Sequence, residues 1–270
     1  MTTPAPVYPV ALTVASTDSG GGAGVPADLR TFHALGVYGT CAIAATTAQN
    51  TVGVHAIDEL PARALTAQID AVCDDIPVSA AKTGALPSAA LLEAAADALR
   101  RHAVPSLVVD PVAISKHGAP LLATDAVGVL RDRLLPLAEV VTPNLHETEL
   151  LTGVAVATAA DQRRAAEALL GFGPRWVLVK GGHLEDSAQA ADLLTDGSQE
   201  IVLVAERIDN PHTHGTGCTL SAAIAAYRAS GLDVPTAARQ AKEFVTGAIR
   251  HGFPLGHGIG PVDVMWRTRI

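Results

Sequence analysis

Short apolar runs alternate with longer stretches of helical periodicity along most of the chain. The runs predict buried strands because they are mostly apolar throughout rather than alternating in polarity, and they cover residues 10–15, 40–47, 52–57, 78–83, 107–113, 138–142 and 176–179. The longer stretches predict helices at residues 26–35, 61–73, 87–101, 120–134, 159–170, 219–227 and 234–250. Two late runs, 191–194 and 200–204, predict a closing hairpin at a sheet edge.

This alternation is typical of an α/β fold with a central, mostly parallel sheet flanked by helices on both faces. A chain of 270 residues is long enough for one large α/β domain, and no linker-like segment divides it. We therefore expect a single domain over residues 1–270.

Polar residues follow several of the predicted strands directly. They are Gln49, Asp110, Asn144, Glu147 and Lys180. Ligands of parallel sheets bind beyond the carboxyl ends of the strands. These side chains are therefore expected to converge on one rim of the sheet.

The strongest chemical signal is the segment GTGC, Gly215 to Cys218, which lies where a loop enters an apolar helix. The first amides of such a helix lack intrahelical partners and carry the positive end of its dipole, so they form a cradle for a phosphoryl group. The same dipole favours a thiolate at Cys218 and would lower its pKa from ~8.5 to about 7.5. The structural alternative is a tight turn followed by a small core residue. A metal site with His212 and His214 is disfavoured, since no second Cys/His pair has zinc spacing.

Asp110 lies inside the apolar run 107–113, near the end of the predicted strand, where a carboxylate is costly to bury unless it is paired or binds a cation. It is therefore a candidate for the magnesium side of a phosphoryl site, together with Glu147. The structural alternatives are a cap for the following loop and, for Asn144 with Glu147, a capping box. Lys180 precedes two glycines and can bring its ammonium to a phosphate.

A glycine loop, Gly20 to Gly24, follows the first strand. The overlapping GAGVPA matches a relaxed dinucleotide fingerprint, but Gln49 stands where that site requires an acidic residue, so an oxidoreductase is disfavoured. Gln49 can donate and accept at once, as recognition of a nitrogen heterocycle with an exocyclic amine requires. Asp28 lies near the same loop. The alternatives are a first-turn helix residue for Asp28 and a solvated loop residue for Gln49.

Charge and composition exclude other classes of function. The net charge is −8, the pI is near 5.6 and aromatic residues make up 3% of the chain, which argues against a nucleic-acid-binding protein. The three cysteines are widely spaced, as for free thiols in a reducing compartment. Neither a signal peptide nor a membrane span is predicted. A cytoplasmic protein with small-molecule partners is expected.

Taken together, the motifs resemble the hydroxymethylpyrimidine and phosphomethylpyrimidine kinases, a family of the ribokinase-like superfamily. The resemblance covers nearly the whole chain and rests on ASTDSGGGAGVPADLRTFHALGVYG, TTAQNT, AAKTG, VVDPV, LLPLAEVVTPNLHETELL, VLVKGGH, THGTGCTLSAAIAA and GHGIGPV. It implies a ribokinase-like fold, ATP and Mg²⁺ as cofactors, and a homodimer. The implied reaction is phosphorylation of 4-amino-5-hydroxymethyl-2-methylpyrimidine and then of its monophosphate, in thiamine biosynthesis.

The resemblance also implies roles for individual residues. Those expected at the pyrimidine are Asp28, Gln49, Gly22 and Gly24. Those expected at the transferring phosphoryl group are Gly215, Thr216, Gly217, Cys218 and Lys180. Asn144, Lys180 and Thr216 are expected to bind the nucleotide, and Asp110 and Glu147 the metal. Cys218 stands where most sugar kinases of the superfamily carry Asp, which makes it the candidate base.

Two alternatives stay open on the same fold. Ala85 stands where the family often has Met, and the roomier pocket this predicts could admit a pyridoxal-like ring. A pyridoxal or related vitamin kinase is therefore the first alternative. The second is a nucleotide-binding protein without catalysis, which the presence of Asp110, Lys180 and the GTGC segment disfavours.

Overall fold

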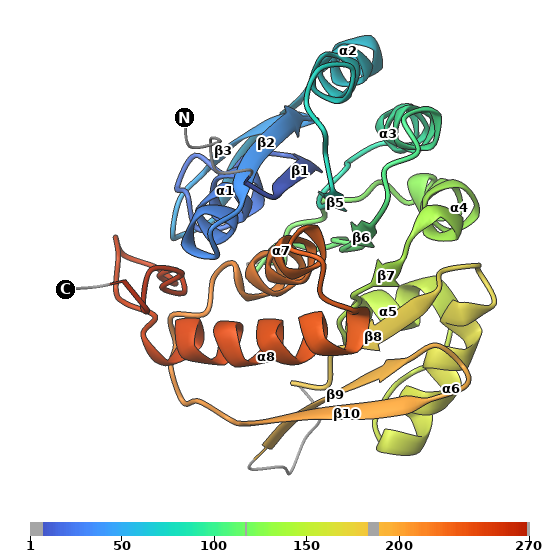
Figure 1. Cartoon of the computed structure of the whole chain (residues 1–270). Helices are drawn as coiled ribbons and strands as arrows, with labels where there is room; N and C mark the ends of the chain where they lie inside the picture. The colour runs from blue at the N-terminus through green and yellow to red at the C-terminus, as the bar shows by residue number, and fades with distance from the viewer. Residues whose placement is uncertain (1–7, 117, 183–188, 269–270) are drawn as a thin grey trace, which may run out of the picture.

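A computed structural model describes residues 8–116, 118–182 and 189–268 (Figure 1). His183, the last residue of the VLVKGGH motif, lies outside these ranges. The main sheet has eight strands in the order β10-β9-β8-β7-β6-β5-β1-β2. Neighbouring strands from β8 through β7, β6, β5 and β1 to β2 are parallel. At the other edge, β9 runs antiparallel to β8 and forms an antiparallel hairpin with β10. The strands are β1 Val10–Ala15, β2 Tyr38–Ile43, β5 Ala80–Thr83, β6 Leu107–Val109, β7 Val140–Val141, β8 Trp176–Val179, β9 Gln189–Thr195 and β10 Glu200–Glu206.

Helices cover both faces of this sheet, as predicted (Figure 1). One layer contains α1, α7 and α8, and the other contains α2, α3, α4, α5 and α6. Their bounds are α1 Gly24–Ala34, α2 Ala62–Cys73, α3 Ala89–Arg101, α4 Ala126–Val129, α5 Leu145–Thr152, α6 Ala159–Leu170, α7 Thr216–Ala229 and α8 Val234–Arg250. The predicted α/β class with a mostly parallel sheet is confirmed.

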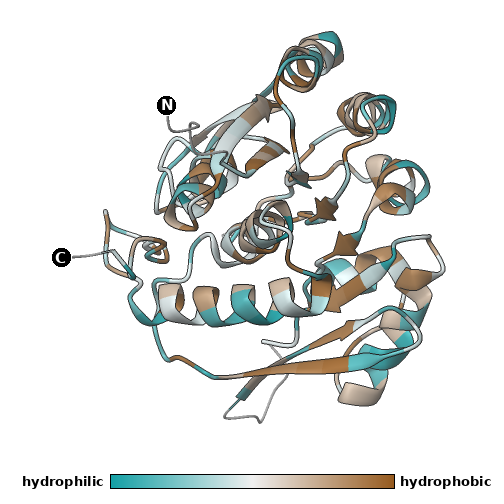
Figure 2. Ribbon diagram, in the orientation of Figure 1, coloured by the Kyte–Doolittle hydropathy of each residue, from teal (hydrophilic) through white to brown (hydrophobic). Residues whose placement is uncertain are grey.

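The sheet has one hydrophobic core on each face, because successive side chains along a strand point to opposite faces. Val108 and Val140 pack with α7 and α8, whereas their neighbours Val109 and Val141 pack with the other helix layer. Both pairs are fully buried. Continuous apolar runs are therefore needed in the central strands, and Figure 2 shows these strands as the most hydrophobic elements.

The predicted strand at residues 40–47 is divided in two. At Ala44 the chain leaves the main sheet, and β3 (Ala45–Gln49) pairs antiparallel with β4 (Val54–Glu59) as a separate two-stranded sheet. The Ala44 amide still bonds the carbonyl of Ala15 at the end of β1. The sequence did not predict this break, because small and apolar residues continue on both sides of Ala44. Because of the break, Gln49 lies in the second sheet and not in the main one.

The predicted helix at residues 120–134 is shorter than expected. A bridge between Ile114 and Pro120 folds the preceding residues into a turn, so helix α4 begins only at Ala126 and continues as the π-helix η1, Leu130–Leu134. The predicted strand 107–113 ends at Val109 for a related reason, since Pro111 has no amide to donate to a ladder. A short 3₁₀ turn, η2 Leu135–Leu137, then leads into β7.

Across the three described ranges, every helix is either too short or too polar to cross a bilayer.

Candidate active site

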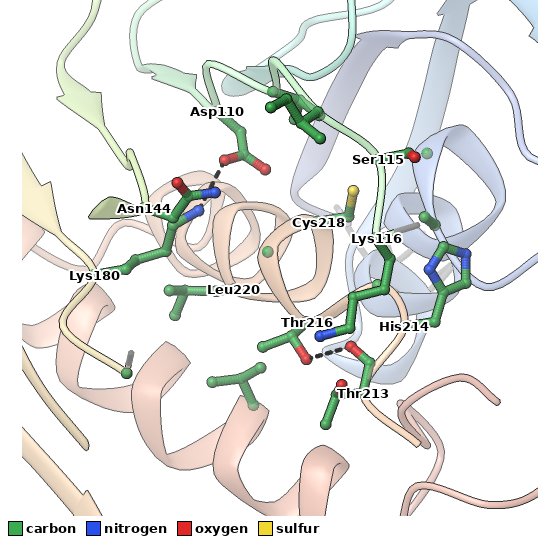
Figure 3. Close-up of a pocket in the computed structure, with 18 of the residues that line it drawn as sticks. Asp110, Ser115, Lys116, Asn144, Lys180, Thr213, His214, Thr216, Cys218 and Leu220 are labelled. Atoms are coloured by element: carbon green, nitrogen blue, oxygen red, sulfur yellow. Dashed lines mark hydrogen bonds and ion pairs between the residues drawn. The ribbon is translucent and has the colours of Figure 1, made fainter. Parts of the chain in front are cut away.

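A cavity of about 590 Å³ lies beyond the carboxyl ends of the parallel strands. It extends from the β3–β4 sheet to α8 and takes in segments that are far apart in sequence (Figure 3). The predicted residues that line it are Gly24, Gln49, Asp110, Asn144, Glu147, Lys180, Gly215, Thr216, Gly217 and Cys218. The expected convergence on one rim is therefore observed, although the role of each residue stays a prediction.

The start of α7 forms one wall of this cavity. Its N-cap, Gly215, has φ of +83°, and a Cβ atom there would lie 1.8 Å from the carbonyl oxygen of Gly22. Only glycine fits both conditions. No side chain caps the helix. The Thr216 amide donates to the carbonyl of Thr213, and the amides of Gly217 and Cys218 are left without an acceptor among the described residues. A Cβ at Gly217 would lie 3.4 Å from Lys180 Nζ, which places a second source of positive charge beside this turn.

The thiol of Cys218 does not behave as the helix dipole predicts. Burial raises its pKa to about 11, although the ammonium of Lys82 and a backbone hydrogen bond from Gly24 oppose the rise. Asp28 and Asp110 raise the pKa further. The lowered pKa expected from the helix dipole is thus not found, because desolvation outweighs the ~0.3–1 kcal/mol that a helix end contributes. A neutral thiol faces the cavity.

A lysine and two carboxylates form the centre of the site. Lys180 Nζ donates to Asp110 Oδ1 at 3.2 Å and lies 3.9 Å from Glu147 Oε2. Asp110 also accepts from the hydroxyls of Thr142 and Ser221. Burial raises the pKa of Glu147 to about 7, with Lys180 opposing the rise and Asp110 adding to it. Glu147 can therefore change its charge near neutral pH.

Helix α5 holds Glu147 in place. The backbone N–H of Glu147 donates to Asn144 Oδ1 at 2.9 Å, and the Glu147 carboxylate accepts from the backbone N–H of Asn144 at 2.8 Å. The capping box expected as the structural alternative is thus present. It does not exclude the functional reading, because both residues also line the cavity.

Two residues predicted at the pyrimidine do not line the cavity. Asp28 is fully buried, with its carboxylate 2.9 Å from the ammonium of Lys82 and 2.6 Å from the hydroxyl of Thr13. Its expected contact with the substrate is therefore corrected: Asp28 is buried against Lys82, and its charge raises the pKa of Cys218. Gly22 likewise packs against the ring of His214, where a Cβ would lie 2.3 Å from Cδ2.

The sequence prediction missed a buried polar cluster at the Gln49 end. Asp18 Oδ2 lies 2.9 Å from His214 Nε2, which in turn lies 3.2 Å from Gln49 Nε2. Burial raises the pKa of Asp18, but hydrogen bonds from His214 and from the amides of Ala23 and Gly20 outweigh it and hold the pKa below its ordinary value. In the sequence, Asp18 and His214 each lie next to a glycine-rich motif. This position was the only feature that could have marked them as site residues.

Two other groups at the cavity were also missed. Lys116 lies on the turn between Ile114 and Pro120, and its side chain points toward Thr213 and Thr216 (Figure 3). At the opposite end, α8 contributes a wall consisting of Lys242, Val245, Thr246 and Ile249. These α8 residues have ordinary helical spacing, which carries no chemical signal in a sequence.

A profile of the phosphomethylpyrimidine kinase family matches residues 18–263. The chain belongs to this family. A hydroxymethylpyrimidine/phosphomethylpyrimidine kinase from Streptomyces coelicolor is 57% identical over 268 residues, which cover 98% of each chain. The resemblance expected from the sequence motifs is thus confirmed.

Solved structures agree on the fold. A pyridoxal kinase from Bacillus subtilis, solved as an ADP complex, is similar with a TM-score of 0.91 and 37% identity, covering 97% of this chain and 100% of its own. A phosphomethylpyrimidine kinase from Clostridium difficile is similar with a TM-score of 0.79 and 41% identity, covering 89% and 99%. Solved structures with this fold thus include a protein named as a pyridoxal kinase and one named as a phosphomethylpyrimidine kinase.

Proposed function

We propose that the protein phosphorylates 4-amino-5-hydroxymethyl-2-methylpyrimidine with ATP and then phosphorylates the monophosphate to the pyrophosphate, in thiamine biosynthesis. The observation that carries the proposal is a single cavity in which the open amides of α7, Lys180 and Asp110 lie between Gln49 and α8. Sequence similarity supports the proposal, since the relative from S. coelicolor is named for both kinase activities.

The reaction requires positioning and charge stabilisation more than covalent help. The hydroxymethyl oxygen attacks the γ-phosphorus in line, and the bond to the leaving ADP oxygen breaks. The amides at the start of α7 that have no backbone acceptor, those of Gly217 and Cys218, and the ammonium of Lys180 stabilise the charge on the transferring group. Because burial raises the pKa of Cys218 to about 11, we infer that the thiol is not the base and that the alcohol gives up its proton to an oxygen of the transferred phosphoryl group.

The residues present fit a magnesium ion. Asp110 and Glu147 are carboxylates beside the phosphoryl site, and Mg²⁺ is usually held by one or two carboxylates together with substrate phosphates and water. Among the described residues, no group of three or more His, Cys, Asp or Glu side chains could hold a metal ion. When bound, the ion neutralises charge between the phosphates.

A direct assay tests the proposal. ADP release is measured with the aminopyrimidine alcohol and with its monophosphate, and ³¹P NMR identifies the products. We expect ADP release to depend on each acceptor and to stop when both are omitted. Release without acceptor consumption would contradict the assignment.

Pyridoxal phosphorylation is the second candidate, supported by Ala85 at the cavity wall and by the likeness to the B. subtilis pyridoxal kinase. We expect kcat/KM for the aminopyrimidine to exceed that for pyridoxal. The opposite ranking would reassign the acceptor without changing the reaction type.

We further infer a homodimer that works in the cytoplasm. Three free thiols, Cys41, Cys73 and Cys218, fit a reducing compartment. Sedimentation velocity of the purified protein tests the dimer, and cell fractionation tests the compartment. A monomer at micromolar concentration, or recovery outside the cytoplasmic fraction, would contradict the corresponding inference.

A further inference from the structure

His214 joins three parts of the site. It precedes the α7 cradle in sequence, packs on the glycine loop at Gly22, and contacts both Asp18 and Gln49 through the same ring nitrogen, Nε2. The side chains of Asp18, Gln49 and His214 are all at least nine-tenths buried. Polar groups this deep must satisfy one another, so the position of each proton is constrained.

The carboxylate fixes the proton of the imidazole. Asp18 accepts hydrogen bonds from the amides of Gly20, Gly22 and Ala23, and these bonds with His214 keep it ionised. An ionised carboxylate only accepts, so the His214 nitrogen that faces it at 2.9 Å must carry a proton. This holds whether the imidazole is neutral or protonated on both nitrogens.

The proton on Nε2 in turn fixes the amide of Gln49. The Gln49 atom at 3.2 Å cannot be a second donor, because two N–H groups would then face each other. A half-turn of the amide exchanges its nitrogen and oxygen without changing its shape, and the hydrogen-bond network decides between them. The carbonyl oxygen therefore lies next to His214, and the NH₂ group takes the other position.

We propose that the Asp18–His214 pair is a positioning device that fixes the Gln49 amide in one orientation and thereby selects 4-aminopyrimidines over their 4-oxo counterparts. The inference rests on the proposed function. An amide held this way offers an acceptor and a donor in a fixed order, which matches an exocyclic amine beside an unprotonated ring nitrogen. A 4-oxo ring presents a carbonyl beside an N–H, and this order is reversed.

The test compares kcat/KM for the 4-amino and 4-oxo 5-hydroxymethyl-2-methylpyrimidines. The wild-type protein is compared with His214→Phe, which removes the donor, and with His214→Gln, which keeps an N–H that can reach Asp18. His212→Gln is the matched control, because His212 lies two residues away, contacts the Gly260 amide and does not line the cavity.

We expect the wild-type protein to prefer the amino ring by about ten- to a hundredfold, since a mismatched buried hydrogen bond costs about that factor. His214→Phe should reduce the ratio to within about threefold of unity, mainly through KM, and His214→Gln should restore part of it. An unchanged ratio in a folded His214→Phe variant overturns the inference but leaves the kinase assignment intact. Failure of the wild-type protein to phosphorylate either ring overturns the proposed function instead.

A measurement on the unmodified protein covers the case in which the variants do not fold. ¹⁵N-labelled histidine shifts report which ring nitrogen carries the proton. We expect a protonated Nε2 at His214 between pH 6 and 8. An unprotonated Nε2 would place the Gln49 amide in the other orientation and overturn the proposal.

Discussion

At the scale of single residues, Cys218 shows how burial and charge compete. Its position in the first turn of α7 favours the thiolate, and the Lys82 ammonium favours it as well. Desolvation nevertheless dominates. The sequence located this thiol correctly but could not supply its protonation state, because the deciding term depends on atoms from distant segments.

We expect Cys218 to react slowly with iodoacetamide. With a pKa of about 11, only about one thiol in ten thousand is ionised at pH 7, and the rate should rise about tenfold for each pH unit between 7 and 9. Peptide mass spectrometry separates Cys218 from Cys41 and Cys73. A rate that levels off near pH 8 would show that the thiolate is already present.

The role of Cys218 in turnover has its own test. Cys218→Ala should keep kcat at saturating acceptor within about tenfold, as expected of a group that is neutral at rest. Cys218→Asp introduces the residue common among sugar kinases and provides the comparison. A loss of about a thousandfold in Cys218→Ala would identify the thiol as the base.

Lys82 and Asp28 form a buried ion pair. Both side chains are fully buried and their charged atoms lie 2.9 Å apart. Lys82→Met should lower the free energy of unfolding by about 3–5 kcal/mol, because it leaves Asp28 without its partner. The double variant Lys82→Met with Asp28→Leu should recover most of that loss in urea titrations. A single variant as stable as the wild type would show that the ion pair does not contribute to stability.

At the scale of elements, α5 combines a structural and a chemical task. The Asn144–Glu147 capping box fixes the helix start, and the same carboxylate lies 3.9 Å from Lys180. The capping pattern is local and could be predicted from sequence. The proximity to Lys180 is not local, since it depends on the register between β7 and β8.

We expect kcat/KM for MgATP to rise about tenfold from pH 6 to pH 8. Burial raises the pKa of Glu147 to about 7, so the carboxyl is mostly neutral below this value and mostly ionised above it, and only the ionised form attracts the metal. Glu147→Gln should flatten the profile. Glu149→Gln, on the exposed face of the same helix, is the control. A flat wild-type profile would exclude Glu147 as the titrating group.

At the scale of the whole molecule, the site is a product of topology. Parallel strands bring Asp110, Asn144 and Lys180 to one rim, and this followed from the strand–helix alternation in the sequence. The division of the predicted strand at Ala44, which moves Gln49 to the second sheet, did not follow. Neither did the α8 wall, because its residues differ from other helix residues only in what they face.

If ADP binds in this cavity of the folded protein, we expect it to raise the free energy of unfolding. At about 100 times its Kd, ADP should contribute ~2.7 kcal/mol and raise Tm by roughly 5–10 °C. Differential scanning fluorimetry with and without Mg²⁺ measures the shift. A Tm that does not move at this ADP concentration would show that the folded protein does not bind ADP.

The close fit of Gly215 over the carbonyl of Gly22 has a consequence for biosynthesis. The two loops come from opposite ends of the chain, and the residue before Gly215 is also bridged to Pro261 near the C-terminus. During translation, the early strands and helices can form while the phosphoryl cradle does not yet exist. A chain synthesised only as far as Gly215 therefore lacks this bridge, and we expect truncation before residue 261 to remove activity.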